Sequence, residues 1–171
     1  MSETMTKPVI RPALMSDVSA ITAIYAGAVT GDTATFEMEA PSEAAMAARM
    51  EAIASAGHPF LVAEINTCVC GYAYASGFRP RAAFALTLED SVYVAPNAQG
   101  RGLGKALLGA LITEASAKGF HQMVAVIGSS RTMAASLALH AALGFEDRGR
   151  LDAVGRKHGQ WLDIVFMQRS L

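Results

Sequence analysis

The spacing of apolar residues along the chain predicts four helices. Apolar side chains recur every three or four residues after Ser16 and Asp17, which can cap a first helix. A second helix is expected after Pro41, because proline suits the first turn of a helix, and it stops before Gly57. The strongest helical pattern spans residues 102–118, and a shorter one spans residues 134–143. The apolar faces of the first and strongest helices consist of Val18, Ile21, Tyr25, Ala28, Val29, Leu103, Ala106, Leu107, Ala110, Leu111 and Ala115.

Short apolar or alternating segments predict seven strands. They cover residues 9–12, 60–65, 69–75, 84–95, 123–127, 145–151 and 161–168. The second and third flank an Asn66–Thr67 turn, which indicates a hairpin, and the fifth is apolar enough to be buried on both faces. The order β-α-α-β-β-β-α-β-α-β-β contains no linker or repeat. We therefore expect residues 1–171 to form one α+β domain with a mixed sheet.

Composition and charge exclude several classes of protein. Hydrophobic residues make up 52% of the 171 residues, so a folded domain is expected, and a net charge of -1 argues against a nucleic-acid partner. The polar start Met1–Pro8 does not resemble a signal peptide, and no apolar run is long enough to span a membrane. We expect a soluble, cytoplasmic protein.

The cysteines and histidines do not indicate a metal site. Cys68 and Cys70 form a single C-x-C without the second pair of ligands that a zinc site requires. The four histidines are scattered along the chain. We expect two reduced thiols beside the hairpin turn and no bound metal.

A glycine-rich turn between a strand and the strongest helix is the main chemical feature. Backbone amides at the start of a helix lack hydrogen-bond partners, and the helix dipole adds positive potential there. Glycines let a phosphate approach this backbone closely, and two basic side chains add positive charge. The turn consists of Gln99, Gly100, Arg101, Gly102, Leu103, Gly104 and Lys105.

Two nucleotide-binding loops do not fit this turn. A Walker A loop requires glycine at position 99 and Ser or Thr at position 106, where this chain has Gln and Ala. The dinucleotide fingerprint requires glycine at position 105, which is lysine, and belongs to the first strand of a βαβ unit. The pattern that fits is Q/R-x-x-G-x-G/A, filled by Gln99, Gly102 and Gly104.

With these residues the chain resembles the GCN5-related N-acetyltransferase (GNAT) family from end to end. The resemblance implies a mixed, mostly antiparallel central sheet flanked by about four helices. It also implies that the glycine turn holds the pyrophosphate of acetyl-CoA. The strand residues Val92, Tyr93 and Val94 would hold the pantetheine arm through main-chain hydrogen bonds.

Within the family, four segments look like those of the phosphinothricin and methionine sulfoximine acetyltransferases. The most specific is the K-H-G-x-W-x-D segment at residues 157–163; the others are residues 92–94, 124–128 and 139–145. One departure concerns the segment after Ile127, which lacks an asparagine that relatives place against CoA. Either this contact is lost or Ser129 or Ser130 supplies it.

The resemblance assigns two residues to catalysis. An amine attacks a thioester only when neutral, and deprotonation costs about 2.7 kcal/mol when its pKa lies two units above ambient pH, so a general base helps. Glu89 occupies the position of that base, and Asp90 should point to the opposite face of the strand. His140 stands where many relatives have a proton-donating tyrosine. It either protonates the departing thiolate or only packs beside the sulfur.

The substrate side is expected to include Phe36 as an aromatic wall and the segment Arg79, Pro80 and Arg81, with Tyr74 and Lys157 as weaker candidates. Arginine binds carboxylate or phosphinate oxygens in a bidentate way. We therefore expect acetylation of the α-amine of a small amino-acid-like substrate, such as phosphinothricin, methionine sulfoximine or methionine sulfone. The alternatives are acetylation of a protein N-terminus or lysine, and a non-catalytic acetyl-CoA-binding module. Relatives suggest a homodimer.

Overall fold

The computed structural model describes residues 7–171, and its elements follow the predicted order; residues 1–6 of the polar start lie outside the described part. The helices are α1 (Val18–Gly31), α2 (Glu43–Ser55), α3 (Leu103–Ala117) and α4 (Met133–Ala142). The strands are β1 (Val9–Pro12), β2 (Phe60–Ile65), β3 (Cys68–Gly77), β4 (Thr87–Val94), β5 (Gln122–Gly128), β6 (Glu146–Lys157) and β7 (Gln160–Ser170). No helix within residues 7–171 is long and apolar enough to cross a membrane.

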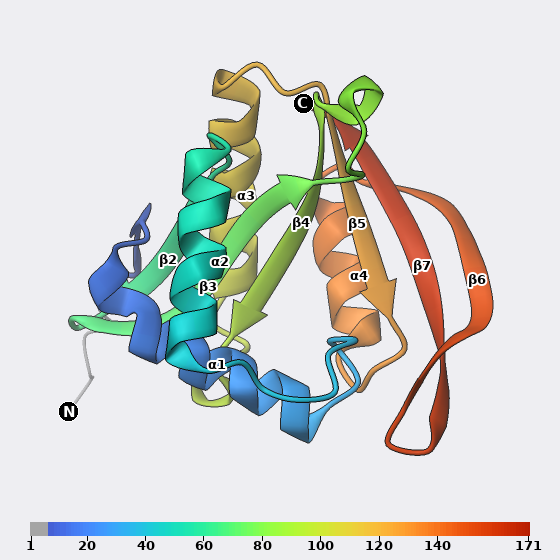
Figure 1. Ribbon diagram of the computed structural model, residues 1–171, viewed down its shortest axis with the longest axis horizontal. Helices are drawn as coiled ribbons and strands as arrows, with labels where there is room; N and C mark the ends of the chain where they lie inside the picture. Colours follow the sequence, from blue (N-terminus) through green and yellow to red (C-terminus); the bar gives the residue numbers. More distant parts are fainter. Residues whose placement is uncertain (1–6) are drawn as a thin grey trace.

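All seven strands form one sheet in the order β1-β2-β3-β4-β5-β7-β6 (Figure 1). Every neighbouring pair is antiparallel except β4 and β5, which are parallel and connected through α3. The prediction of a mixed, mostly antiparallel sheet with four helices is therefore confirmed.

The two faces of the sheet carry separate apolar cores. Along β3, Tyr72 packs toward α1 and α2, while its neighbours Ala73 and Ala75 pack toward α3, as the alternation of side chains in a strand requires. Figure 1 shows α1 and α2 over the part of the sheet that contains β2–β4, with α3 and α4 behind it. One layer of strands thus lies between two layers of helices.

Several predicted strand boundaries were wrong; β3 and β7, for example, end at Gly77 and Ser170 rather than at residues 75 and 168. The strand predicted at residues 84–95 begins only at Thr87, because Ala82–Phe84 form a 3-10 turn. β6 continues to Lys157 and β7 begins at Gln160. The two strands approach each other this closely in the sequence because His158 and Gly159 both have positive φ and form a tight hairpin turn. These two turn residues belong to the K-H-G segment, so this motif also contains the hairpin turn.

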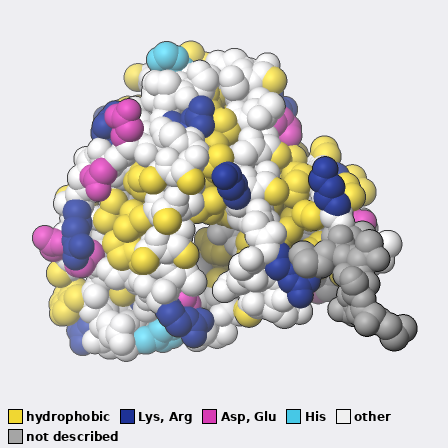
Figure 2. Space-filling model, turned by 180° about the vertical axis from the view of Figure 1, so that it is seen from behind, with side chains coloured by type: hydrophobic (Ala, Val, Ile, Leu, Met, Phe, Trp, Pro, Cys, Tyr) yellow, Lys and Arg dark blue, Asp and Glu magenta, His cyan; other side chains and the backbone are white. Residues whose placement is uncertain are grey.

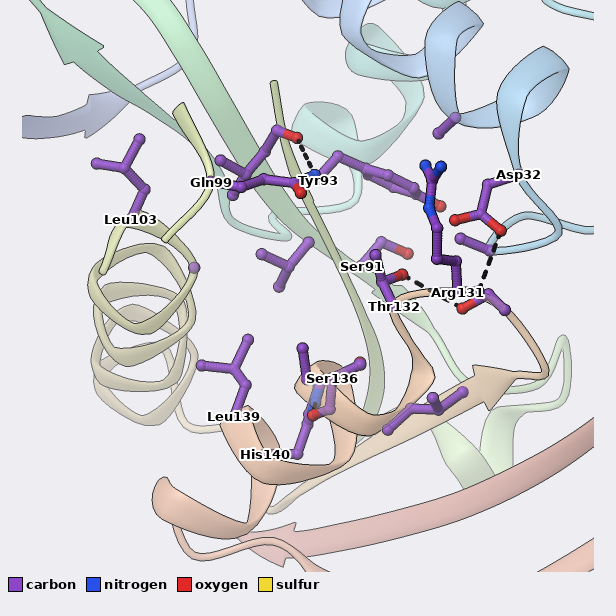
Figure 3. A pocket seen from close by; sticks show the side chains of 18 of the residues that line it. Asp32, Ser91, Tyr93, Gln99, Leu103, Arg131, Thr132, Ser136, Leu139 and His140 are labelled. Atoms are coloured by element: carbon purple, nitrogen blue, oxygen red, sulfur yellow. Dashed lines mark hydrogen bonds between the residues drawn. The ribbon is translucent and has the colours of Figure 1, made fainter. Parts of the chain in front are cut away.

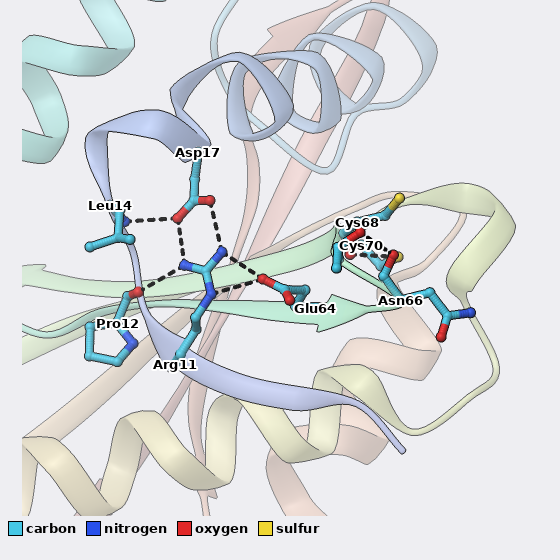
Figure 4. A network of polar contacts seen from close by, with 9 residues as sticks. Arg11, Pro12, Leu14, Asp17, Glu64, Asn66, Cys68 and Cys70 are labelled. Carbon is cyan, nitrogen blue, oxygen red and sulfur yellow. Dashed lines mark hydrogen bonds and ion pairs between the residues drawn. The ribbon is translucent and has the colours of Figure 1, made fainter. Parts of the chain in front are cut away.

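Asp17 does not cap α1 with its side chain as predicted. Its carboxylate instead accepts hydrogen bonds of 2.8 and 2.9 Å from Arg11 and one of 2.8 Å from the Leu14 amide (Figure 4). Arg11 also donates to Glu64 on β2. This ion-pair network joins β1, β2 and the start of α1, and the hydrogen bonds from Arg11 hold the pKa of Asp17 below its usual value despite burial.

Candidate functional site

The parallel strands β4 and β5 separate partway along their length. Their last paired residues are Glu89 and Val124, yet β4 continues to Val94 and β5 to Gly128. β4 stays paired with β3 up to Val94, and β5 stays paired with β7 up to Gly128. The sheet therefore opens between these two strands, and unpaired backbone faces the gap from both sides.

The glycine turn lies at the open end of this gap. Gly102, directly before α3, has a φ of 76° and Gly100 a φ of 74°, a left-handed conformation that glycine adopts without strain. No side chain caps α3, so its first amides point outward with the positive end of the helix dipole. The turn therefore has the geometry of a phosphate-binding helix start.

A cavity of about 580 Å³ extends from the glycine turn into the gap between the strands. Figure 3 shows Gln99 and Leu103 on the side of the glycine turn, and Ser136, Leu139 and His140 of α4 on a second side of the cavity. In Figure 2, which looks at the molecule from behind, the surface is hollowed between α3 and α4. Of the ten residues predicted to bind the cofactor, those that line the cavity are Val92, Tyr93, Val94, Gln99, Gly100, Gly102, Leu103, Gly104 and Lys105. Arg101 is exposed outside it.

The loop after β5 also lines the cavity. Ser130 and Thr132 do so with their hydroxyl oxygens 3.2 Å apart, and Arg131 lies between them. Ser129 instead accepts a hydrogen bond from the Asp163 amide at 2.9 Å, which ties this loop to β7. Of the two serines that could supply the contact of the missing asparagine if it is not lost, only Ser130 lines the cavity. No motif or spacing in the sequence pointed to Thr132.

His140 is buried at the inner end of the cavity. Its Nδ1 lies 2.7 Å from the Ser136 carbonyl oxygen, and its Nε2 lies 3.0 Å from Oδ1 of Asp90. Burial lowers the pKa of His140, but the hydrogen bond and charge of Asp90, together with the hydrogen bond to the Ser136 carbonyl, raise it more, so the net shift is upward. Burial raises the pKa of Asp90, although the hydrogen bond from His140 opposes this effect. No sequence pattern indicated this partner of His140.

Glu89 lies on the opposite face of β4 from Asp90, as strand alternation predicted. Leu88, two residues before Asp90, belongs to the core beneath α3, whereas Tyr93, four residues after Glu89, packs against the core beneath α1 and α2. Burial raises the pKa of Glu89, the neighbouring Asp90 raises it further, and Arg79 lowers it in part. Glu89 is therefore a half-buried carboxyl at the point where the sheet divides.

The predicted substrate residues lie in two separate loops. Arg79, Pro80 and Arg81 are exposed before β4, and the Arg79 guanidinium lies 5.2 Å from the centre of the Phe78 ring. Phe36 is 48% exposed and lies against Gly128 at the end of β5, so closely that a Cβ there would come within 2.9 Å of the ring. Only Arg79 among these residues influences the pKa of Glu89.

Lys157 fixes the loop that carries Phe36. It is 1% exposed, and its ammonium donates a hydrogen bond of 2.9 Å to the Thr35 carbonyl oxygen. Thr33 in the same loop donates to the Ser129 carbonyl oxygen at 2.6 Å. The weaker candidate Lys157 is thus an anchor between the β6–β7 hairpin and this loop. Tyr74, the other weaker candidate, stacks on Phe60 in the core beneath α1 and α2.

Comparisons with known proteins agree with this geometry. The sequence model of the "Acetyltransferase (GNAT) family" matches residues 25–145. The chain is 49% identical over 155 residues to the phosphinothricin N-acetyltransferase of Alcaligenes faecalis, covering 91% of this chain and 78% of that protein. It is 45% identical over 163 residues to the L-methionine sulfoximine/L-methionine sulfone acetyltransferase of Pseudomonas paraeruginosa, and the match covers 95% of this chain and 94% of that protein.

A solved structure shows the same fold. The GNAT superfamily phosphinothricin acetyltransferase from Sinorhizobium meliloti, in complex with AcCoA, superimposes with a TM-score of 0.92 at 48% identity, covering 96% of this chain and 88% of that one. These likenesses agree with the divided sheet and the uncapped glycine turn. The chain belongs to the acetyltransferase (GNAT) family.

Proposed function

We propose that this chain is an acetyl-CoA-dependent N-acetyltransferase that acetylates the α-amine of a small amino-acid-like substrate of the phosphinothricin, methionine sulfoximine or methionine sulfone type. The observation that carries the proposal is the cavity that runs from the glycine turn to the point where β4 and β5 divide. A long cosubstrate with a phosphate at one end and a reactive group at the other matches this shape. Relatives named for these substrates share 45–49% of the aligned residues.

In this proposal the cavity residues bind acetyl-CoA along its length. The amides at the start of α3 and the Lys105 side chain face the pyrophosphate. The free backbone of Val92, Tyr93 and Val94 offers hydrogen bonds to the pantetheine arm, as a strand edge does to an added strand. The uncapped helix start and the unpaired strand edge support this placement.

Glu89 acts as the general base in this proposal. The carboxylate accepts a proton from the substrate ammonium, and the neutral amine then attacks the acetyl carbonyl carbon. Two observations support this role: Glu89 lies where the sheet divides, and burial raises its pKa toward the range in which a carboxylate is a useful base. His140 contributes at the sulfur end, where it either protonates the thiolate or packs beside it.

The Arg79 side of the molecule receives the substrate in this proposal. A guanidinium near the base can bind the carboxylate or phosphinate of an amino-acid analogue and place its amine at Glu89. Arg81 and Pro80 complete the entrance, and Phe36 forms a wall on the other side of the gap. The influence of Arg79 on the pKa of Glu89 supports the proximity of the two groups.

Steady-state kinetics test this function. Thiol release from acetyl-CoA is measured with a panel of phosphinothricin, methionine sulfoximine, methionine sulfone, ordinary amino acids and peptides with free N-termini or lysines. The proposal predicts the highest kcat/KM for the sulfoximine, sulfone or phosphinothricin. A preference for peptides would favour protein acetylation, and thiol release at background with every amine would favour a non-catalytic acetyl-CoA-binding module.

We also propose that the protein is a cytoplasmic homodimer. Leu151, Val154 and Trp161 on the β6–β7 hairpin are all about half exposed or more, and such apolar side chains commonly mark an interface. Cys68 and Cys70 are free, which suits a reducing compartment. Sedimentation equilibrium gives the mass directly, and a monomer at micromolar concentration would contradict the dimer.

A further inference from the structure

Asp90 and His140 form a buried polar pair that neither the fold nor the proposed base requires. Asp90 lies on β4 between Leu88 and Val92, which face the apolar core beneath α3. The exposed fractions of Asp90 and His140 are 8% and 4%. Burial of a carboxyl among apolar residues is costly unless the carboxyl is paired. The presence of Asp90 between two core-facing residues of β4 therefore indicates a role for its carboxyl.

The hydrogen bonds of His140 determine which of its nitrogens carry protons. Nδ1 faces the Ser136 carbonyl oxygen at 2.7 Å and must donate, because a carbonyl only accepts. Nε2 faces Asp90 Oδ1 at 3.0 Å, and this contact holds one proton, on either the imidazole or the carboxyl. His140 therefore has no free N–H. Its exchangeable proton belongs jointly to His140 and Asp90.

The second carboxyl oxygen of Asp90 is unpaired. Oδ2 is buried and has no hydrogen-bond partner among residues 7–171, although Asp90 itself lines the large cavity. Whichever group carries the shared proton, Oδ2 is left as an acceptor. A buried acceptor without a partner is unfavourable, so it suits a site that a hydrogen-bond donor of a bound molecule completes.

The position of Asp90 on β4 places the pair where the reactive end of a bound cosubstrate would lie. Asp90 follows Glu89, the last residue of β4 that pairs with β5. It lies four residues from Val94, roughly 13 Å along a strand, and the glycine turn begins beyond that point. A cosubstrate with its phosphates on the glycine turn would therefore bring its far end to Asp90 and His140.

We propose that Asp90 is a positioning residue for acetyl transfer, which orients His140 through one shared proton and keeps that proton at the reactive end of the cavity. The proposal rests on the proposed function. It also places Oδ2 as an acceptor for an N–H donor of the bound cosubstrate or for the S–H of the CoA thiol that the reaction releases. His140 and Asp90 then act as one unit, and neither is effective without the other.

The surroundings of His140 make Asp90 the group that controls its charge. The elements packed around the imidazole are α4, with the Ser136 carbonyl, the Phe145 ring after α4, and β4, with Asp90. Asp90 also raises the pKa of Glu89 on the other face of β4. Without the carboxylate, only the hydrogen bond to the Ser136 carbonyl would oppose burial, so the pKa of His140 would fall.

The variant Asp90→Asn tests this proposal, because it keeps the shape and removes the charge and the shared proton. We expect kcat to fall roughly 10- to 100-fold, while KM for acetyl-CoA changes less than about threefold. The alkaline pH at which kcat declines should move down, because the pKa of His140 falls. A role confined to packing would not move this pH limit.

Matched variants separate the possible outcomes. Glu51→Gln, an exposed acid-to-amide change on α2, should leave kcat and its pH profile unchanged. The double variant Asp90→Asn with His140→Gln should lose no more activity than the worse single variant, as expected of residues that act as a unit. Losses that multiply, or an Asp90→Asn enzyme with wild-type kcat and pH profile, would overturn the proposal.

Thermal unfolding and NMR complete the test. The melting temperature of Asp90→Asn shows whether the variant is folded at the assay temperature, and an NMR titration of His140 in the acetyl-CoA complex reads the shared proton directly. A His140 pKa that is the same with and without the Asp90 carboxyl would overturn the proposal even in a poorly active variant. Absence of wild-type turnover with every amine would instead contradict the proposed function.

Discussion

Glu89 combines a position at the division of the sheet with a carboxyl whose pKa is raised by burial. As a base it must be ionised, so activity should fall as pH drops through its pKa in the folded protein, which burial raises above its ordinary value. Replacing it with glutamine keeps the size but removes the base. We expect Glu89→Gln to lower kcat/KM about 100- to 1,000-fold.

The pH profile distinguishes loss of a base from loss of structure. Without Glu89, only amine molecules already neutral in solution can react, so the residual kcat/KM of Glu89→Gln should keep rising with pH toward the amine pKa. An unchanged kcat/KM would show that another group accepts the proton. A flat and uniformly low profile would point to a misfolded site.

Arg79 and Arg81 provide a matched pair, because both are exposed arginines of one loop but only Arg79 influences Glu89. If Arg79 binds the substrate carboxylate or phosphinate, Arg79→Gln should raise KM for the amine about tenfold, the usual effect of losing a charged hydrogen bond. KM for acetyl-CoA should not change. Initial-rate kinetics on both variants check this, and a larger effect of Arg81→Gln would reverse the assignment.

The start of α3 depends on a backbone conformation rather than on side chains. Gly102 and Gly119 flank this helix with φ of 76° and 85°, and a methyl group added at either would meet no atom within 4 Å. Alanine at either site should cost about 1 kcal/mol of folding stability through backbone strain. Only Gly102→Ala should also weaken acetyl-CoA binding, because only Gly102 lines the cavity.

Calorimetric titration with CoA and urea denaturation separate these two effects. We expect similar unfolding midpoints for the two alanine variants and a several-fold higher Kd only for Gly102→Ala. Equal Kd values for both variants would show that the conformation of the turn does not contribute to binding.

The elements that carry strong local signals could be predicted from sequence, and those fixed by distant contacts could not. The period of α3 and its flanking glycines lie within one segment, so the position of the helix and of the glycine turn before it could be predicted. The pairing of Asp90 with His140 joins β4 to α4 across 50 residues, and only the fold brings them together. Lys157 likewise reaches Thr35 across 122 residues.

The network of Arg11, Asp17 and Glu64 holds the edge of the sheet to α1, so it should influence the stability of the whole domain. Replacing Arg11 with methionine leaves two carboxylates without their partner, and we expect a loss of about 2 kcal/mol in the free energy of unfolding at pH 7. Because the pKa of Asp17 is lowered in the folded state, its contribution is present above the unfolded value near 3.8 and is lost as pH falls below it.

Urea denaturation from pH 7 to pH 3.5 measures this contribution. The difference between wild type and Arg11→Met should shrink below about pH 4, where Asp17 in the unfolded chain is protonated. Arg148→Met serves as the control, since the ion pair of Arg148 with Glu146 and its hydrogen bonds to Gln168 and the Asp147 carbonyl are all exposed, and the change should alter stability by less than about 0.5 kcal/mol. A difference that is independent of pH would exclude Asp17 as the responsible group.

Across the whole molecule, the order of elements specified the fold well, because hydrophobic periodicity marked each helix and strand. The division of the sheet could not be derived from periodicity, because β4 and β5 show continuous strand patterns beyond the point where they stop pairing. That division creates the cavity. The resemblance of motifs predicted its ligand, whereas the physical pattern alone predicted only an anion at the start of α3.

Transfer of a labelled acetyl group tests the central claim most directly. The protein is incubated with acetyl-CoA carrying ¹³C at the carbonyl carbon and with methionine sulfoximine carrying ¹⁵N at the α-nitrogen, and the product is followed by NMR. We predict that the thioester carbonyl signal is replaced by an amide carbonyl signal coupled to the α-nitrogen, in proportion to the thiol released. Label that remains in the thioester, or appears only as free acetate, would contradict the account.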